Sequence, residues 1–326
     1  MKIFITGATG FIGSRLAKRL AESGMHVTAL VRDPHKAVEL DALGVHLVKG
    51  DIRDKASMLE GMRGADQVFH VAAWYKIGSN ERALAEAINI QGTRNVMDLV
   101  RELSIPRCVY TSTIAVHSNT HGEEVDESYR FTGRHLSIYD ETKWRAHYEV
   151  VEPMVKAGLP VITVMPGLVY GPGDTSSVGG ALDSYLKRKL PLIPRGTVYN
   201  WAHVEDIVNG HLLAMKKGTP GECYHLTGPR FDMLTVFRMA EQMTSIPAPR
   251  LIVSGGLLKM MIPLMAILEQ FVNLPATFTA EGLREVADVT YLADSSKARR
   301  ELGFTTRPLE EGLKETLVYL QQRKSS

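Results

Sequence analysis

Cysteine is scarce in this sequence. The 326 residues include two cysteines, Cys108 within an apolar run and Cys223 far along the chain. Two isolated thiols give no basis for a disulfide framework or a cysteine-based metal site. This scarcity excludes a small disulfide-stabilised fold, and we expect a reducing, cytoplasmic location.

A surplus of charge of either sign is also missing. Lysine and arginine together number 38 and aspartate and glutamate 36, which leaves a formal net charge of +2. A chain without a basic surplus has no overall field with which to hold a polyanion. We therefore expect no nucleic acid partner.

The sequence lacks an apolar run long enough to cross a membrane. The most apolar stretch, Leu251 to Leu274, is interrupted by Lys259, Pro263 and Glu269 before it reaches the ~20 apolar residues that a spanning helix needs. We expect no membrane span. The pattern leaves open whether this stretch is a lid over a site, part of the core or a surface that touches a membrane.

Short apolar runs alternate with helical patterns through the first half of the chain. Between the runs, apolar residues recur at helical spacing, as at Ile12, Leu16 and Leu20. Strands that alternate with helices form a parallel sheet covered by helices on both faces. The sequence therefore predicts an α/β fold with a doubly wound parallel (Rossmann) sheet. The six predicted strands are 2–6, 26–31, 45–49, 67–71, 107–111 and 161–165.

The pattern changes after Pro166, where glycine and proline become frequent and clean alternation stops. We place a boundary near Gly171. Residues 1–170 are expected to form a cofactor-binding Rossmann domain, to which the chain returns at about 199–227, and residues 171–326 mainly a smaller substrate-binding region. The tail from Asp294 predicts two short amphipathic helices that close the fold.

The first predicted strand runs directly into a glycine-rich turn and then a helix. The turn has glycine at positions 7, 10 and 13, a Gly-x-x-Gly-x-x-Gly spacing rather than the Gly-x-Gly-x-x-Gly of the common dinucleotide fingerprint. Glycines in this context let backbone amides and a helix N-terminus approach a pyrophosphate. The alternative is a tight turn that binds nothing.

The second strand ends at Val31 and Arg32, where an acidic residue would hold the ribose 2′-hydroxyl of NAD. An arginine pairs well with a 2′-phosphate. This residue favours NADP over NAD. The alternative is that Arg32 only decorates the strand end, while Asp33 caps the next helix with Pro34 at its first position.

Further on, Ser137 starts a helix in which Lys143 follows Tyr139 by four residues, so the two side chains share one helix face. A tyrosine with its ordinary pKa of about 10 is a poor base at neutral pH. A neighbouring ammonium lowers that pKa. Alone, this spacing also fits two unrelated surface residues.

Taken together, these segments resemble the extended short-chain dehydrogenase/reductase family, part of the NAD-dependent epimerase/dehydratase superfamily. The matching pieces occur in family order over nearly the whole chain. They are TGATGFIG at 6–13, GDIRD at 50–54, HVAA at 70–73, NIQGT at 89–93, VYTST at 109–113, YDETK at 139–143, PGLVYGPG at 166–173, WAHVEDIVNGHLLAM at 201–215 and SKARRELGF at 296–304.

The resemblance implies a role for each matching residue. Thr113 corresponds to the active-site hydroxyl, Tyr139 to the general acid/base, and Lys143 to the residue that binds the nicotinamide ribose and lowers the tyrosine pKa. Family members carry serine or threonine at the position of Thr113, and Ser112 lies beside it. The implied cofactor-binding residues are Gly7, Thr9, Gly10, Phe11, Ile12, Gly13, Arg32, Asp51, Ile52, Ala72, Ala73, Asn89, Lys143, Pro166 and Val169.

Within this family the chain resembles the dihydroflavonol-4-reductase-like branch. Sugar-modifying members carry an Arg-Asp-Phe triplet where this chain has Asn200, Trp201 and Ala202. The resemblance therefore implies an NADPH-dependent reductase of a ketone or aldehyde. The alternatives are a nucleotide-sugar epimerase or dehydratase, whose phosphates Lys187 to Lys189 and Arg195 would bind, and a non-catalytic NADP-binding regulatory protein.

The substrate is expected to be a small, apolar, ring-containing molecule. Trp74, Tyr75 and Tyr170 follow strands near the expected chemistry and are candidates for its binding wall. The methionine-rich stretch around Met260 to Met265 is a candidate lid, although core packing explains it as well.

Two further features carry less weight. His117 and His121 are four residues apart, but the loop-like sequence between them and the lack of a third ligand argue against a metal site. His203 and Asp206 are expected to be structural. The chain is expected to be a homodimer or a monomer, because the apolar stripe Ala87, Ile90, Met97 and Val100 fits either an interface or the core.

Overall fold

The computed structural model describes residues 1–272 and 274–323. At its centre is a seven-stranded, fully parallel sheet with the strand order β10-β6-β5-β4-β1-β2-β3. All six predicted strands are confirmed, with ends that move by one residue at most. The seventh, β10, falls in the segment expected to return to this domain. The strands are β1 (Lys2–Thr6), β2 (His26–Val31), β3 (His46–Lys49), β4 (Gln67–His70), β5 (Cys108–Thr111), β6 (Val161–Pro166) and β10 (Cys223–Leu226).

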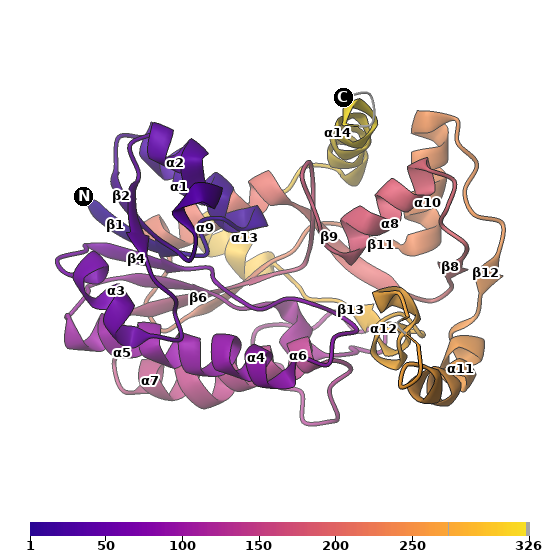
Figure 1. Cartoon of the computed structure of the whole chain (residues 1–326), viewed down its shortest axis with the longest axis horizontal. Helices are drawn as coiled ribbons and strands as arrows, with labels where there is room; N and C mark the ends of the chain where they lie inside the picture. Colours follow the sequence, from indigo (N-terminus) through magenta and orange to yellow (C-terminus); the bar gives the residue numbers. More distant parts are fainter. Residues whose placement is uncertain (273, 324–326) are drawn as a thin grey trace.

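Helices cover both faces of this sheet, as predicted (Figure 1). One face packs against α1 (Phe11–Glu22), α9 (Val204–Lys217) and α13 (Ser296–Leu302) through a core that includes Leu16, Ile207 and Leu302. The other face packs against α3 (Lys55–Met62), α5 (Thr93–Glu102) and a helix described below, through residues such as Met58 and Val96. Strands buried on both sides must be apolar throughout, which explains their composition.

Two long helices on the second face each contain a π-helical turn. The first runs through α4 (Arg82–Glu86), η2 (Ala87–Gly92) and α5, and the second through α6 (Ile138–Arg145), η4 (Ala146–Val151) and α7 (Glu152–Lys156). Arg145 donates to Glu86, and Arg82 to Glu141, which ties the two helices together. In the apolar stripe considered as an interface, Met97 and Val100 belong to the core, whereas Ala87 and Ile90 are half-buried.

The second region lies beside the carboxyl ends of the central strands (Figure 1). It has a small sheet in which β9 (Val198–His203) pairs with β7 (Leu168–Tyr170), β11 (Arg230–Asp232) and β13 (Thr290–Tyr291), and a ribbon of β8 (Ile193–Pro194) and β12 (Ile252–Val253). Its helices are α8 (Ser177–Leu186), α10 (Met233–Thr244), α11 (Gly255–Leu268), α12 (Ala280–Arg284) and α14 (Leu309–Gln322). The short elements left are η1 (Pro34–Ala37), α2 (Val38–Ala42), η3 (Ile114–His117) and η5 (Ala276–Phe278). The two predicted tail helices are α13 and α14.

The methionine-rich helix α11 has one buried and one exposed face. Leu258 packs with Val253 and Leu283 in a small separate core. Met260 and Leu264 are 72% and 60% exposed on the opposite side. Among the described residues, no helix has the length and apolar character needed to cross a membrane.

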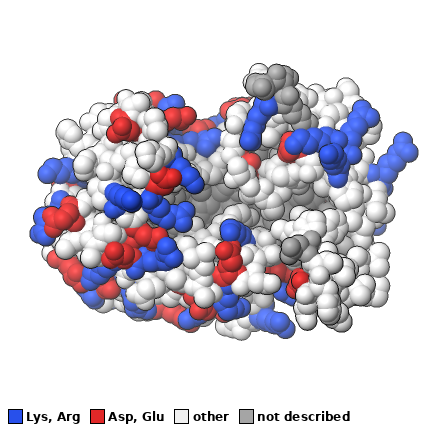
Figure 2. Space-filling model, in the orientation of Figure 1, with Lys and Arg blue, Asp and Glu red and all other residues white. Residues whose placement is uncertain are grey.

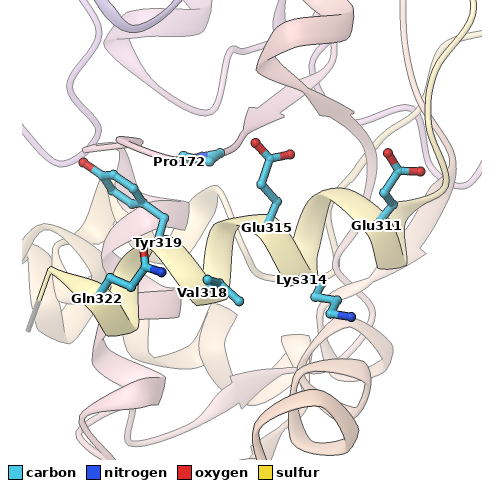
Figure 3. Close-up of a pocket in the computed structure, with 7 residues that line it drawn as sticks. All are labelled: Pro172, Glu311, Lys314, Glu315, Val318, Tyr319 and Gln322. Carbon is cyan, nitrogen blue, oxygen red and sulfur yellow. The ribbon is translucent and has the colours of Figure 1, made fainter.

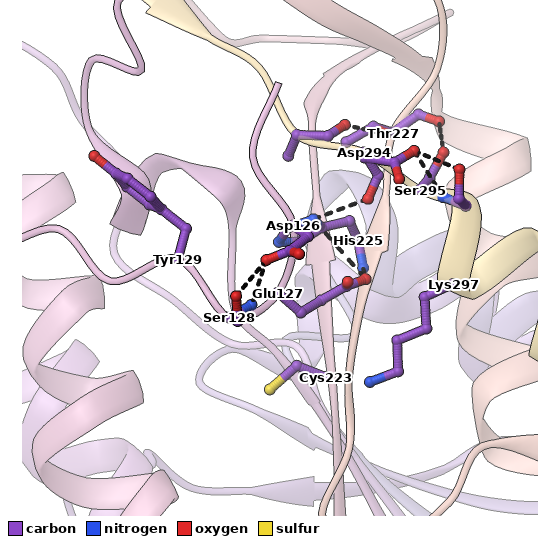
Figure 4. Close-up of polar contacts among 12 residues, drawn as sticks. Asp126, Glu127, Ser128, Tyr129, Cys223, His225, Thr227, Asp294, Ser295 and Lys297 are labelled. Carbon is purple, nitrogen blue, oxygen red and sulfur yellow. Dashed lines mark hydrogen bonds and ion pairs between the residues drawn. The ribbon is translucent and has the colours of Figure 1, made fainter. Parts of the chain in front are cut away.

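The loop that follows η3 is fixed by polar contacts around His225 (Figure 4). Glu127 accepts a hydrogen bond from the backbone N–H of His225, and His225 Nδ1 donates to the carbonyl oxygen of Asp294, 3.0 Å away. His225 Nε2 is therefore free to accept from His117 Nε2 at 2.9 Å. His117 is thus buried in a structural contact, whereas His121 is exposed. The part of the chain that is described contains no group of three metal-ligating side chains.

The chain returns to the central domain through α9 and is then fastened by an ion pair. His203 Nδ1 accepts from the Glu205 amide and so caps α9. Arg307 donates to Asp206 through its side chain and its backbone N–H, with Nη2 to Oδ1 at 3.0 Å and N to Oδ2 at 2.9 Å. These contacts give His203 and Asp206 structural roles, in keeping with the sequence.

We expect Asp206→Ala to lower the free energy of unfolding by about 2 kcal/mol, because it leaves a mostly buried guanidinium with fewer partners. Urea denaturation measures this. Glu60→Ala removes a fully exposed pair with Arg63 and should leave the free energy of unfolding nearly unchanged, because solvent screens such a pair. Equal effects of the two substitutions would show that the Asp206 pair does not fasten the tail.

Candidate active site

A cleft of about 840 Å³ opens at the carboxyl ends of the central strands, between the two regions. Figure 2 shows this face hollowed between the two halves of the molecule. In the sheet order, β1 and β4 are neighbours, and the connections that leave them run in opposite directions, from β1 to β2 and from β4 to β5. Open α/β sheets bind ligands at such a point. The volume is that of a site for a small molecule or cofactor.

The glycine turn forms one wall of the cleft. Gly7 has a φ of +76°, and a Cβ on it would lie 2.6 Å from the backbone nitrogen of Ala72. A Cβ on Gly13 would lie 2.1 Å from the carbonyl oxygen of Gly7. Helix α1 begins directly after Gly10, and no side chain caps its first turn. The turn is thus a cradle of backbone that opens on the cleft and leaves helix N–H groups available to an anion. Thr9, Phe11 and Ile12 line it as well.

The far end of this wall carries the residues expected around an adenosine. Arg32 is exposed at the end of β2 and lines the cleft with Asp51 and Ile52. Asp51 accepts two side-chain hydrogen bonds from Arg53, which lower the pKa of the carboxyl. Asp33 caps η1 by accepting from the His35 amide. Asp33 therefore has the predicted capping role, whereas Arg32 lines the cleft.

The three expected catalytic side chains all line the same cleft. Thr113 follows β5 and accepts a hydrogen bond from the Ala115 amide at 3.1 Å. Ser137 caps α6, as predicted, and the helix places Tyr139 and Lys143 one turn apart. Ala72, Ala73, Pro166 and Val169 also line the cleft, opposite or beside them.

Lys143 is fully buried beneath this surface. Its Nζ donates to the backbone oxygen of Thr111 at 2.9 Å and to Tyr110 Oη at 3.2 Å. Burial lowers the pKa of the ammonium to about 7. The lysine is therefore close to losing its proton at neutral pH.

The pKa of Tyr139 departs from the sequence expectation. Burial raises it above the ordinary value, the neighbouring Tyr75 adds to the shift, and hydrogen bonding with Thr113 opposes it. The lowering expected from Lys143 is not among the main causes of the shift, because desolvation penalises the phenolate. Tyr139 consequently holds its proton at neutral pH.

Three residues expected at the site lie outside the cleft. Asn89, expected to bind cofactor, is buried in η2, where its side chain contacts both backbone groups of Trp74 and the hydroxyl of Thr142. Trp74 is itself buried, at 4% exposure. Tyr170 packs edge-on against Trp201 and donates to a backbone oxygen of α14. Of the proposed aromatic wall, Tyr75 alone faces the cleft, with its ring 4.7 Å from that of Tyr139.

Several cleft residues were not foreseen. Asp140, Glu285 and Tyr291 line it, as do Tyr199 and Asp174. Asp140 directly follows the expected catalytic tyrosine, so its position was open to inference. Glu285 and Tyr291 reach the cleft through the packing of α12 and β13, which no local sequence pattern reveals.

A second, shallower hollow lies between the turn at Pro172 and helix α14 (Figure 3). Glu315 and Tyr319 point toward this turn in the figure. Glu315 is already paired with Arg307 at 3.2 Å. This hollow therefore contains no set of side chains comparable to that of the cleft.

Comparisons with known proteins agree with this geometry. Residues 3–226 match the family model for the NAD dependent epimerase/dehydratase family. The chain is 30% identical to a protein of Synechocystis named "Putative dihydroflavonol 4-reductase", over 98% of this chain and 94% of that one. It is 31% identical to 4-hydroxy-2-methyl-3-oxo-4-farnesyl-3,4-dihydroquinoline-1-oxide ketoreductase of Stigmatella aurantiaca, over 70% of this chain and 68% of the relative.

The fold also matches solved structures. The crystal structure of gox2253 superposes with a TM-score of 0.85 at 28% identity and covers 98% of each chain. The family match spans the glycine turn, Thr113, Tyr139 and Lys143. The protein belongs to the NAD-dependent epimerase/dehydratase family and is an NAD(P)-dependent oxidoreductase of the extended short-chain dehydrogenase/reductase type.

Proposed function

We propose that the protein is an NADPH-dependent reductase of a ketone or aldehyde on a small, mainly apolar, ring-containing substrate. The observation that carries the proposal is the meeting of Thr113, Tyr139 and Lys143 in one cleft with the glycine cradle. A protein that only binds a cofactor has no use for this trio, which argues against a purely regulatory role.

The residues present fit a dinucleotide. The backbone cradle at Gly7 and Gly13, which a Cβ would fill, and the uncapped start of α1 suit a pyrophosphate. Arg32 is exposed at the end of β2, where Val31 stands in place of the acidic residue that would bind a ribose 2′-hydroxyl, so this residue suits a 2′-phosphate and supports NADP over NAD. When bound, the nicotinamide supplies the hydride. Lys143 offers two of its three donors to protein oxygens, which leaves one for a ribose hydroxyl.

Tyr139 acts as the proton donor in this proposal. Its raised pKa keeps the phenol protonated at neutral pH. A carbonyl oxygen that gains a hydride's electrons becomes an alkoxide, a much stronger base than a phenolate, so the proton passes from Tyr139 Oη to that oxygen. The Thr113 hydroxyl donates a hydrogen bond to the same oxygen and stabilises its charge.

The lining of the cleft supports a carbonyl compound over a nucleotide sugar. Tyr75, Ile77 and Tyr199 give it apolar surface. Its substrate side also contains the carboxyls Asp140 and Glu285, which would repel a second pyrophosphate. The basic residues that a sugar nucleotide would need, Lys187 to Lys189 and Arg195, do not line the cleft. Relatives named as reductase and ketoreductase point the same way.

We expect Tyr139→Phe to reduce NADPH-dependent turnover at least about 10³-fold, because it removes the proton donor, while cofactor affinity stays nearly unchanged. A screen of NADPH oxidation against aromatic ketones, aliphatic aldehydes, steroids and nucleotide sugars supplies the substrate. Tyr75→Phe, which removes the neighbouring phenol oxygen, is the matched control and should retain most activity. Equal turnover by wild type and Tyr139→Phe would refute the mechanism.

Cofactor choice is tested at Arg32. Arg32→Ala should weaken NADP binding by about 10- to 100-fold, the worth of one charge-assisted contact, and leave NAD binding almost unchanged. Calorimetric titration of both cofactors measures this. Arg53→Ala, which removes a nearby arginine already paired with Asp51, is the control. Wild-type protein that binds NAD and NADP equally would remove the argument.

The lowered pKa of Lys143 predicts a pH-dependent affinity. Above pH 7 the free protein holds this group increasingly as the amine, so a ligand that needs the ammonium must bind together with a proton. We expect cofactor affinity to fall as the pH rises from 7 to about 9. Proton uptake is measured by calorimetry in two buffers of different ionisation enthalpy. Lys143→Met should abolish the uptake that wild type shows, and uptake that persists in the variant would contradict this assignment.

A further inference from the structure

Large apolar side chains are concentrated on one exposed part of the second region. Among the described residues, nine of the fifteen large apolar side chains that are exposed to solvent lie within residues 251–272. Phe271 is 79% exposed and Ile267 is 59% exposed. We call this surface the α11 patch, and an exposed patch of this kind marks a site that another molecule covers. Its members are Leu251, Ile252, Leu257, Met260, Leu264, Ile267, Leu268, Phe271 and Val272.

The apolar side chains form a stripe along α11. Met260, Leu264 and Ile267 follow one another at spacings of four and three residues, so they share one side of the helix. The other side packs against the protein through Leu258. Few coloured side chains lie over α11, at the lower right of Figure 2. The stripe is therefore a continuous apolar surface that the described part of the chain leaves uncovered.

The α11 patch has little with which to hydrogen-bond to a partner. Lys259 is the one polar side chain within α11, and its Nζ donates to Asp288 at 3.2 Å. Just after the helix, Glu269 accepts from the Ala280 amide and Gln270 donates to a backbone oxygen of α11. A typical protein–protein interface forms about ten hydrogen bonds. This surface therefore suits an apolar medium better than the surface of another protein.

Two arginines at the edge of the patch have no charged partner. Arg250 directly precedes Leu251, and Arg195 follows the neighbouring strand β8, where its backbone N–H donates to the Val253 oxygen at 2.8 Å. Both arginines are exposed, and neither side chain forms an ion pair or hydrogen bond within the described residues. A second copy of the chain would bring the same arginines, whereas Asp288 is already paired. Negatively charged phosphate groups would complement these arginines better.

The patch also lies near the cleft. Val272 is four positions before Ala276, which lines the cleft together with Ile77. A Cβ on Gly78 would lie 2.7 Å from the carbonyl oxygen of Ala276, so the two segments are in close contact. A molecule that covers the patch would therefore be close to this side of the cleft.

We propose that the α11 patch is a peripheral membrane-binding surface. Its apolar side chains enter one leaflet of a phospholipid bilayer, and Arg195 and Arg250 contact anionic headgroups. Burial of apolar area in the interface and attraction of basic residues to anionic lipid together produce reversible binding of this kind. The combination of apolar side chains, unpaired arginines and few hydrogen-bonding groups fits such a surface better than it fits a second copy of the chain.

Vesicle flotation tests the proposal. The full chain is mixed with vesicles of phosphatidylcholine, or of an equal mixture of phosphatidylcholine and phosphatidylglycerol, and the bound fraction is measured. Wild type should bind both and should prefer the mixed vesicles by about fivefold for each arginine that meets an anionic headgroup. Analytical ultracentrifugation without lipid measures self-association in the same buffer.

A double substitution in the stripe isolates the apolar contribution. Met260→Gln with Leu264→Gln keeps long side chains, adds no charge, and should lower the partition onto mixed vesicles at least about tenfold. Val38→Gln with Val318→Gln makes the same kind of change at exposed positions outside the patch and should bind like wild type. Circular dichroism and thermal unfolding establish that both variants are folded.

The headgroup contacts are tested separately. Arg195→Gln with Arg250→Gln should remove most of the preference for mixed vesicles, because the two free charges are lost, and should keep the binding to phosphatidylcholine. A preference that persists in this variant would contradict the contacts assigned to the two arginines.

The remaining outcomes decide between a membrane and a second copy. Absence of vesicle binding by wild type, or equal binding by the stripe variant and its control, would overturn the membrane surface. A wild-type dimer that Met260→Gln with Leu264→Gln dissociates would show that a second copy covers the patch, and would overturn it as well. Vesicle binding does not require turnover, so the proposed reductase succeeds or fails independently of these results.

Discussion

The backbone at the end of β1 passes against the backbone at the end of β4 with no space for a side chain between them. A Cβ on Gly7 would come within 2.9 Å of the Cα of Ala72, and a Cβ on Gly13 would come closer still, 2.1 Å from the carbonyl oxygen of Gly7. Strand, turn and helix are thereby joined at van der Waals distance. The uncapped start of α1 is consequently fixed at the point where the sheet order reverses, and the cleft is built outward from this contact.

The position of the opposite wall of the cleft depends on the buried side-chain amide of Asn89. Asn89 contacts the backbone nitrogen and oxygen of Trp74 and the side chain of Thr142, so it joins the segment after β4 to α6. Thr142 lies between Tyr139 and Lys143 on that helix. Asn89 therefore positions α6, the helix of Tyr139 and Lys143, without reaching the cleft itself. Either this structural role or ligand binding would explain why Asn89 belongs to the segment that matches the family. The sequence alone does not distinguish these two explanations.

Local sequence patterns correctly predicted the features that depend only on residues close together in the chain. The parallel strands, the cap at Ser137, the glycine turn and the face shared by Tyr139 and Lys143 all follow from periodicity, backbone sterics and helix geometry. Tyr170 shows the limit of such reasoning. It follows β6 closely in sequence, yet its ring turns into the core beneath α14 because β7 pairs with β9. Which side of a short strand faces the cleft depends on that pairing.

Residues brought in from the second region were beyond prediction for the same reason. Glu285 and Tyr291 lie more than a hundred positions from Asp140, and only the packing of α12 and β13 gives them a common site. The pKa of Tyr139 likewise reflects burial, which spacing along a helix does not report. Long-range packing and desolvation thus account for most of the differences between the expected and the observed site.

The charged groups that line the cleft differ between its two ends. Its glycine wall offers helix N–H groups and Arg32, both of which attract phosphate, whereas its other end has the carboxyl groups of Asp140 and Glu285. The first end therefore suits the phosphates of a dinucleotide and the second end does not, because opposite charges attract and like charges repel. The buried Lys143 lies beside the junction, where it donates to Thr111 and Tyr110. The same gradient favours phosphate groups at the glycine end of the cleft and disfavours them at the end that contains Asp140 and Glu285.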